Sequence, residues 1–339
     1  MTDFITEGKV KIKVYKGKIS KKLPVFYNPV MELNRTISVV LLNSINKNNL
    51  QIALPLAASG IRGIRFLKEL KKGKIKTLEM NDYSSQALRL IKENLKINKI
   101  KSKKIKLHNS NANIFLLESS GFDYIDIDPF GTPNPFLDAA IIRIARDGIL
   151  AITATDTSAL AGTYINACKR KYFAIPLKNE LKHEIGIRIL IRKVQLIGAQ
   201  YEKALTPIFS YSKEHYMRIF FKCEKGKKKV DEIIEKHGHY ENSGPMWLGQ
   251  LWDKKLAEKM YMQEKTDFLK IIKNESKIDV FGFYDIHAIC KKHKIKQIPS
   301  FDVLIERIKK AGYKVSKTHF KPEGLKSTIL LPKLLQLMK

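Results

Sequence analysis

Cysteine is scarce in this sequence, and so are long apolar runs. The three cysteines, Cys168, Cys223 and Cys290, lie far apart and form no C-x-x-C pair. Neither a zinc ribbon nor a disulfide framework is therefore encoded, and we expect no metal site. No apolar run approaches the roughly 18–20 residues that span a bilayer. The start, MTDFITEGKV, lacks the basic and apolar regions of a secretory signal, so we expect a cytoplasmic protein without a membrane partner.

Acidic residues are also few. Asp and Glu number 33 against 63 Lys and Arg in 339 residues, which gives a formal net charge of +30. Such an excess repels itself unless an anionic partner is present, so a polyanion is the first candidate partner. Because 44% of the residues are hydrophobic, the chain can form a packed core, and its length favours two domains.

From residue 50 onward, strand-like and helix-like patterns alternate. We expect strands near 51–57, 74–80, 103–108, 122–128 and 147–155, and helices near 61–70, 84–96, 113–119, 134–145 and 179–200. This alternation predicts an α/β fold in which helices cover both faces of a parallel sheet. A hairpin over 205–223 would add antiparallel edge strands.

The two ends of the chain have other patterns. Residues 1–25 predict a short β extension with a turn near Lys16 and Gly17. The sequence KGKKK at 225–229 is a break in composition and predicts a linker. We therefore expect residues 1–224 to form one domain and residues 225–339 a smaller α+β domain.

A loop of small residues follows the first strand of the alternating region. It reads Ala-Ala-Ser-Gly at 57–60, and Asn81-Asp82 ends the next strand. Small residues let a ligand approach the backbone at a helix N-terminus. An acidic residue about 20 positions later can accept hydrogen bonds from ribose hydroxyls. A tight turn and a helix cap are the alternatives, but together the two features favour a nucleoside cofactor.

The strongest local signal is Asp126-Ile-Asp-Pro-Phe-Gly131, at the end of the fourth strand of that region. Open α/β sheets bind ligands at the carboxyl ends of their strands. There the Asp128 carboxylate can accept a hydrogen bond from an exocyclic amine, and the Phe130 ring can stack on a planar base. Asp156 ends the next strand and either lines the same crevice or caps a helix. A metal-binding or capping Asp128 is the alternative.

These segments resemble, in sequence and order, the archaeal tRNA (guanine-N2-)-dimethyltransferase family, over roughly residues 24–250. The matching motifs are Phe26-Tyr-Asn-Pro-Val-Met-Glu-Leu-Asn-Arg35, Ala58-Ser-Gly-Ile-Arg-Gly-Ile-Arg-Phe66, Asn81-Asp82, Asp128-Pro-Phe-Gly131, Thr153-Ala-Thr-Asp-Thr157 and Gly244-Pro245 with Trp247-Leu-Gly249. One such match means little, but the ordered set is specific.

The resemblance implies a class I methyltransferase (Rossmann-like) domain with a seven-stranded sheet, and a C-terminal domain that contacts tRNA. It implies transfer of one and then a second methyl group from S-adenosyl-L-methionine to N2 of guanosine 26 in tRNA. The chain is expected to act as a monomer. The implied cofactor contacts are Arg35, Arg62, Asp82, Asn111 and Ala112. The implied catalytic residues are Asp128, Phe130 and Phe26, with Pro129, Gly131 and Asp156 as further substrate contacts.

Two positions depart from the family pattern. Leu54 stands where relatives often carry an acidic residue, and Asn111 stands where an acid is common. Cofactor contacts at these places would rest on backbone groups. Two alternatives remain: an amino-methyltransferase that acts on another nucleic acid or a protein, and a non-catalytic RNA-binding protein.

Overall fold

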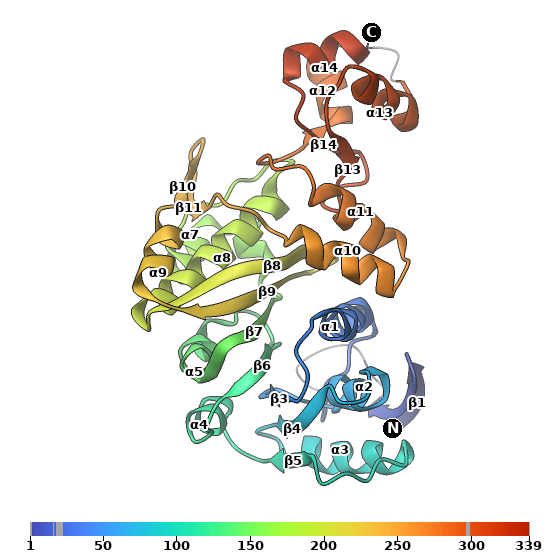
Figure 1. Cartoon of the computed structure of the whole chain (residues 1–339), viewed down its shortest axis with the longest axis vertical. Helices are drawn as coiled ribbons and strands as arrows, with labels where there is room; N and C mark the ends of the chain where they lie inside the picture. Colours follow the sequence, from blue (N-terminus) through green and yellow to red (C-terminus); the bar gives the residue numbers. More distant parts are fainter. Residues whose placement is uncertain (1, 16, 18–22, 296–298, 339) are drawn as a thin grey trace.

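The computed structural model describes residues 2–15, 17, 23–295 and 299–338. Its centre is a seven-stranded sheet with the strand order β5-β4-β3-β6-β7-β9-β8 (Figure 1). The strands are β3 (Leu50–Leu54), β4 (Ile75–Asn81), β5 (Ile105–His108), β6 (Phe122–Ile127), β7 (Ile144–Ala154), β8 (Lys203–Lys213) and β9 (Tyr216–Lys225). β3 to β7 are mutually parallel, whereas β9 pairs antiparallel with both β7 and β8. The predicted α/β fold and terminal hairpin are confirmed.

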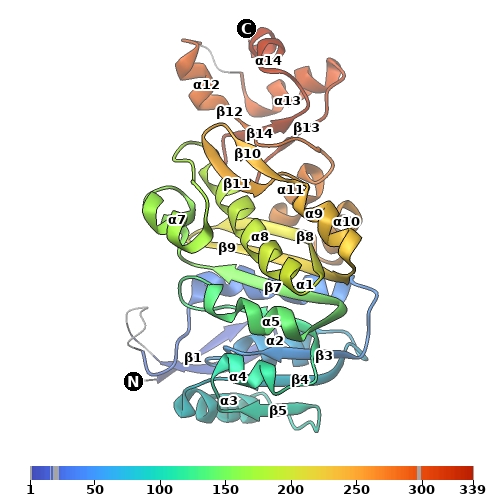
Figure 2. The ribbon, with the colours of Figure 1, turned by 90° about the vertical axis from the view of Figure 1, so that its left-hand side faces the viewer.

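Helices cover both faces of this sheet (Figures 1 and 2). One face carries α1 (Glu32–Ser44), α2 (Ile61–Glu69) and α3 (Ser85–Ile97), and the other carries α4 (Ala112–Leu117), α5 (Leu137–Arg143) and α8 (Lys182–Gln200). Because both faces are covered, the central strands are apolar along their length. Ile52, Ile125 and Ile152 on β3, β6 and β7 have no exposed surface.

The strand order places a topological switch between β3 and β6. The chain runs outward from β3 to β4 and β5, and then returns to the other side of β3 with β6. Connections on the two sides therefore diverge, and a crevice opens at the carboxyl ends of β3 and β6. Short helices follow the neighbouring strand ends: η2 (Asn134–Phe136) after β6, and α6 (Thr157–Leu160) and α7 (Ile165–Tyr172) after β7.

The N-terminal extension is a hairpin of β1 (Thr2–Glu7) and β2 (Val10–Tyr15). The turn predicted near Lys16 and Gly17 stays a prediction, because Lys16 and residues 18–22 lie outside the described residues. The turn of the hairpin itself lies at Gly8, where φ is +54°. Glycine adopts this left-handed conformation at little cost, which explains the position of the turn. Alternate residues of β2 are buried in the same hydrophobic cluster as the central sheet.

The predicted linker at 225–229 is wrong. β9 extends to Lys225, and α9 (Lys227–Ile234) begins almost at once. Val230 and Ile233 are buried in the same hydrophobic cluster as the central sheet, and this burial outweighs the mutual repulsion of the lysines. The elements that follow α9 also pack in this cluster: β10 (His237–Tyr240), β11 (Ser243–Trp247), α10 (Lys254–Gln263) and α11 (Asp267–Glu275). So does η1 (Pro29–Met31), which precedes α1.

The last part of the chain has its own small core, at the top of Figure 1. A three-stranded sheet of order β12-β14-β13 packs with three helices. The elements are β12 (Tyr284–Asp285), α12 (Ile286–Lys292), α13 (Phe301–Lys310), β13 (Val315–Lys317), β14 (Gly324–Ser327) and α14 (Leu331–Met338). The domain boundary at 224/225 stays a prediction. Within the described ranges, no helix has the length and hydropathy needed to cross a bilayer.

Candidate active site

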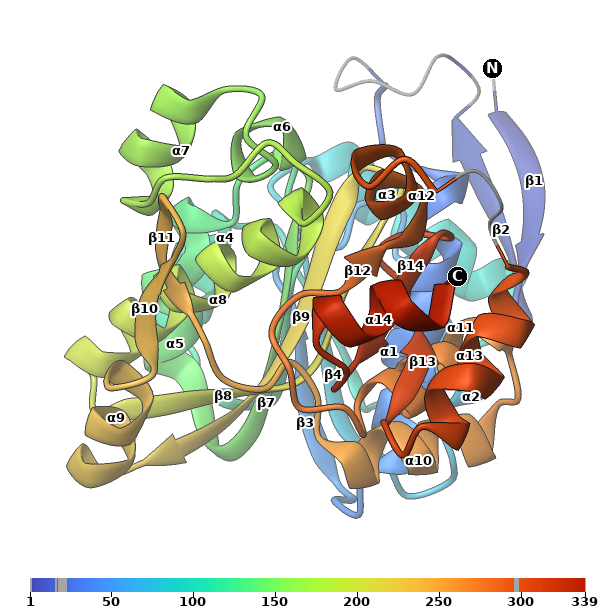
Figure 3. The same cartoon turned by 90° about the horizontal axis from the view of Figure 1, so that it is seen from above.

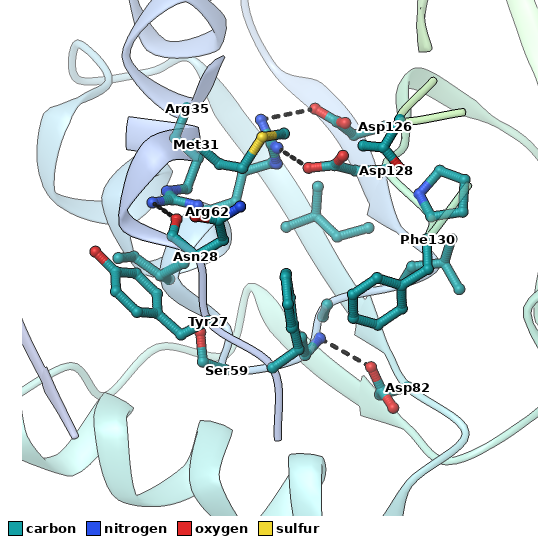
Figure 4. A pocket seen from close by; sticks show the side chains of 18 of the residues that line it. Tyr27, Asn28, Met31, Arg35, Ser59, Arg62, Asp82, Asp126, Asp128 and Phe130 are labelled. Carbon is teal, nitrogen blue, oxygen red and sulfur yellow. Dashed lines mark hydrogen bonds and ion pairs between the residues drawn. The ribbon is translucent and has the colours of Figure 1, made fainter. Parts of the chain in front are cut away.

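A cavity of about 400 Å³ opens at the carboxyl ends of β3, β4 and β6, where the strand order reverses. Figure 4 shows that polar and aromatic side chains face each other across it. Many of the predicted site residues line it: Phe26, Arg35, Arg62, Asp82, Asp128, Pro129 and Phe130. The structure thus brings together side chains from five separate segments of the chain.

The loop of small residues forms one wall of the cavity. Gly60 ends it with φ +78°, and a Cβ atom there would lie 2.9 Å from the Ile91 side chain. The Ala58 amide donates a hydrogen bond to Oδ2 of Asp82 at 2.8 Å, and the Ser84 amide donates to Oδ1 at 2.9 Å. Two backbone amides therefore hold the Asp82 carboxylate at the cavity, and Figure 4 draws the bond from the small-residue loop.

The Asp128 carboxylate lies opposite, at the end of β6. Its Oδ2 forms an ion pair with Nη2 of Arg62 (Figure 4). Asp128 lines the cavity, and no other described residue hydrogen-bonds to its side chain, so the acceptor capacity of Oδ1 is unused. The Asp128 side chain is 21% exposed. A carboxylate oxygen in this setting can accept a hydrogen bond from a ligand N–H group.

Behind Asp128 lies a network of buried side chains that the sequence did not reveal. Arg218 on β9 has no exposed surface and donates to both carboxylate oxygens of Asp126, at 2.8 and 2.7 Å. Arg62 lies 3.4 Å from Asp126 and donates to the Ser38 hydroxyl and the Asn34 amide oxygen. Burial raises the pKa of Asp126, but the charges of Arg218 and Arg62 outweigh burial and the pKa lies below its ordinary value. Asp126 is therefore an anion that orients Arg62.

The signal that could have revealed this network was an arginine inside an apolar strand. Arg218 interrupts the run Tyr-Met-Arg-Ile-Phe-Phe of β9, and a charge so placed needs a partner. Its partner is Asp126, 92 residues away.

Two aromatic rings form the mouth of the cavity. The centroids of the Phe26 and Phe130 rings lie 4.2 Å apart, at an interplanar angle of 76°. Phe130 is 44% exposed. Edge-to-face rings of this kind offer apolar walls on which a planar base can stack.

Arg35 lines the cavity, and its guanidinium is bound by Glu7 of the N-terminal hairpin. Its Nε donates to Glu7 at 2.7 Å, and its Nη2 donates to the Asn28 carbonyl at 3.1 Å. Glu7 also accepts from Arg65 and from the Tyr27 hydroxyl. Burial raises the pKa of Glu7, but its hydrogen bonds and charge interactions with Arg35 and Arg65 outweigh burial and lower it overall. The β extension thus supplies a buried anion beneath the site, which sequence reasoning missed.

Other predicted residues lie close to the cavity without lining it. Asn111 caps α4 through a 2.9 Å hydrogen bond from the Asn113 amide, and Ala112 is buried beside it. The Gly131 amide donates to Thr155. Asp156 accepts from the Tyr172 hydroxyl at 2.8 Å and from Lys171 at 3.1 Å. Their ligand contacts stay predictions. Leu54 does line the cavity, so its wall there is apolar.

A family model described as N2,N2-dimethylguanosine tRNA methyltransferase matches residues 7–243 and 235–339. The chain belongs to this family. Relatives include the tRNA (guanine(26)-N(2)/guanine(27)-N(2))-dimethyltransferase of Aquifex aeolicus, 37% identical, with 99% of this chain and 96% of that protein aligned. The tRNA (guanine(26)-N(2))-dimethyltransferase of Methanosphaera stadtmanae is also 37% identical over the same shares.

The fold agrees with a solved member of the family. The structure of Trm1 from Pyrococcus horikoshii with S-adenosyl-L-methionine superposes with a TM-score of 0.90 at 36% identity, covering 99% of this chain and 100% of that one. The predicted family and fold class are confirmed. Among the residues that the structure describes, no group of three or more His, Cys, Asp or Glu is placed to hold a metal ion.

Proposed function

We propose that this enzyme transfers a methyl group from S-adenosylmethionine to the exocyclic N2 of guanosine 26 in tRNA, and then a second one. The observation that carries the proposal is the cavity at the strand switch. On one side of it lie the Asp128 carboxylate, with an unused acceptor oxygen, and the rings of Phe26 and Phe130. On the other side lies Asp82, which accepts a hydrogen bond from the loop of small residues. The family membership supports the same reaction.

The cavity wall formed by the loop of small residues and Asp82 suits the cofactor. Asp82 offers carboxylate lone pairs to ribose hydroxyls, and the small residues at 57–60 leave backbone groups within reach of a ligand. Arg35 and Arg62 line the cavity. Each is paired with an acid, Glu7 and Asp128 respectively, but a guanidinium has five N–H donors and can also donate to the carboxylate of a methionyl group. When bound, S-adenosylmethionine supplies an electrophilic methyl group on a sulfonium. Leu54 gives this wall no anion, so Asp82 is the acid that positions the nucleoside.

The residues of the opposite side fit a guanine. Phe26 and Phe130 can stack on the ring, and Oδ1 of Asp128 can accept from N2–H. Because the lone pair of N2 is delocalised into the ring, an acceptor that orients the amine favours attack. Asp128 then accepts the proton that N2 loses. The first product keeps one N–H, so once Asp128 has released its proton to water, the same acceptor can orient that product for a second transfer.

The guanosine must leave the stacked helix to reach this cavity. Extrusion costs a few kcal/mol, and least at a weakly paired position. The net charge of +30 offsets that cost through contacts with phosphates. We further propose that the enzyme acts in the cytoplasm as a monomer. Its cysteines at 168, 223 and 290 are free and buried, which suits a reducing compartment.

The test compares wild type with Asp128→Asn on unmodified tRNA. Nucleosides from the treated tRNA are separated and weighed by mass spectrometry. Wild type is expected to form N2-methylguanosine and then N2,N2-dimethylguanosine, and a tRNA with adenosine at position 26 is expected to form neither. Asp128→Asn should lower turnover roughly 100-fold or more, because it removes the proton acceptor, while tRNA binding persists.

The matched control is Asp147→Asn, an exposed aspartate at the amino end of β7, which should leave turnover unchanged. Near-normal turnover in Asp128→Asn would contradict the assigned role. Methylation of DNA or of a protein, with tRNA left unmodified in parallel reactions, would overturn the substrate class.

A further inference from the structure

We propose that α7 and its flanking residues dock the tRNA strand that neighbours the extruded guanosine. This inference rests on the proposed tRNA methyltransferase function and names the surface that holds the substrate. The residues of this surface, called the α7 platform below, are Tyr164, Asn166, Lys169, Arg170 and Phe173.

The α7 platform exposes two large rings beside the active site. Tyr164 and Phe173 are each 64% exposed, and Nζ of Lys193 lies 5.0 Å from the centroid of the Phe173 ring. Exposed rings next to cations are the usual stacking platform for unpaired bases, because every base has a π face.

A surface hollow at the start of α7 adds polar groups. Tyr164, Asn166 and Arg170 line it together with Thr163. A hydroxyl, an amide and a guanidinium can donate to phosphate oxygens and base edges, and the ring can stack. This is the chemistry that holds a single nucleotide.

The charge of α7 is entirely positive. Its last turn carries Lys169, Arg170 and Lys171. Lys171 pairs with Asp156, whereas Lys169 and Arg170 form no ion pair with any residue in the described parts of the chain. Two exposed cations without counter-ions suit a phosphate backbone.

Hydrogen bonds join the α7 platform to the loop that carries Phe130. The Tyr172 hydroxyl lies 3.1 Å from the Thr132 hydroxyl, and the side-chain amide of Asn134 donates to the Lys171 backbone carbonyl at 2.8 Å. A strand bound on the platform would therefore be held in a set position relative to the proposed guanine site.

Another basic helix lies at the opposite edge of the sheet and supplies a control. Met217 pairs with Ala154 at the end of β7 near the cavity, whereas Lys222 pairs with Ile149. Lys225 lies eight positions after Met217 on β9. The end of β9, just before α9, is therefore roughly 26 Å along the strand from the end that lies near the cavity. Figures 2 and 3 also place α7 and α9 at opposite sides. Lys227 and Lys228 on α9 are exposed.

The experiment measures the Kd for unmodified tRNA, together with single-turnover methyl transfer at saturating tRNA. In Lys169→Gln with Arg170→Gln we expect the Kd to rise about tenfold, and the salt dependence of log Kd to fall by about one for each lost phosphate contact. Tyr164→Ala, which changes no charge, should also raise the Kd about tenfold. Methyl transfer at saturation should stay near normal in both.

The controls remove two exposed lysines and one exposed apolar side chain elsewhere; of the lysines, Lys227 lies 3.5 Å from Glu202, and Lys228 forms no ion pair within the described residues. Lys227→Gln with Lys228→Gln and the exposed Met262→Ala should change the Kd less than twofold. Unchanged binding of S-adenosylmethionine by calorimetry shows that each variant is folded. An α7 variant that binds tRNA like wild type, or α9 variants that weaken binding as much, would overturn the inference. Failure of wild type to methylate tRNA would instead overturn the proposed function.

Discussion

At the scale of single residues, charge alternates from the core to the cavity. Arg218, Asp126, Arg62 and Asp128 follow one another in a chain of ion pairs. Because Arg218 engages both oxygens of Asp126, Arg62 remains available to Asp128. The orientation of the proposed proton acceptor therefore depends on an arginine that does not line the cavity.

Arg218→Met tests this dependence. It leaves a buried carboxylate without its main partner, and we expect a loss of unfolding free energy of about 3–5 kcal/mol at neutral pH. Arg62 would then be drawn toward Asp126 and away from Asp128. Because Asp128 is the proposed proton acceptor, turnover should fall more than the affinity for tRNA. Urea unfolding and steady-state kinetics measure both effects, with the exposed Arg146→Met as the control.

The loss of unfolding free energy in Arg218→Met should shrink as the pH falls. The pKa of Asp126 lies below its ordinary 3.8 in the folded protein, so its pairing stabilises the fold above that value and is lost as the pH falls through the folded pKa. The stabilities of wild type and Arg218→Met should converge below about pH 4. A constant difference down to acidic pH would show that Asp126 is not the group involved.

At the scale of elements, α3 holds the N-terminal hairpin through side chains and not by sheet pairing. Asn94 bonds the amide and carbonyl of Lys13, at 2.7 and 3.2 Å, and Asn98 does the same for Lys11, at 3.1 and 2.7 Å. Asn94 also donates to the Ser59 carbonyl at 3.0 Å. One helix thus connects the β extension with the loop of small residues at 57–60.

Replacing each asparagine should separate these two connections. Asn98→Ala is expected to cost about 1–3 kcal/mol of hairpin stability, seen as faster hydrogen exchange at Lys11, with unchanged affinity for S-adenosylmethionine. Asn94→Ala should speed exchange at Lys13 and also weaken cofactor binding, because Ser59 lines the cavity. Equal cofactor affinity in the two variants, measured by calorimetry, would refute the link through Ser59.

At the scale of the whole molecule, a buried glutamate joins the small C-terminal core to the main body. Glu184 on α8 accepts from Arg188 at 3.0 and 2.8 Å, from the Gly282 amide at 3.1 Å, and lies 3.5 Å from Nζ of Lys326 on β14. Burial raises the pKa of Glu184, but the charges of Lys326 and Arg188 outweigh it and lower the pKa to about 2.

Acid should therefore loosen this junction. The ion pairs of Glu184 stabilise the protein above its ordinary pKa of 4.5, and that contribution is lost as the pH falls toward about 2. Glu184→Gln should cost about 3–5 kcal/mol at neutral pH and flatten the stability profile in this window. Limited proteolysis of the junction near Gly282 and urea unfolding measure both. The exposed Glu180→Gln should retain the slope, and a Glu184→Gln profile as steep as wild type would contradict the assignment.

Much of the molecule could be predicted from the sequence. Family, enzyme class, cofactor and the seven-stranded fold are confirmed. The α/β alternation rests on local patterns, since the period of apolar residues reports helix or strand. The family, the enzyme class, the cofactor and the seven-stranded sheet rest instead on the resemblance of the ordered motifs to a known family. The roles of individual site residues, the domain boundary, the monomeric state and the cytoplasmic location stay predictions.

Tertiary structure alone decided the partners of the charges. Arg62, predicted to face the cofactor, pairs with Asp128, and Arg35 pairs with Glu7 of the hairpin. Periodicity tells which face of an element is buried, but a buried charge takes whichever counter-charge the neighbouring strands and helices bring near it. That neighbour is set by strand order and packing across many residues, so no local pattern contains it.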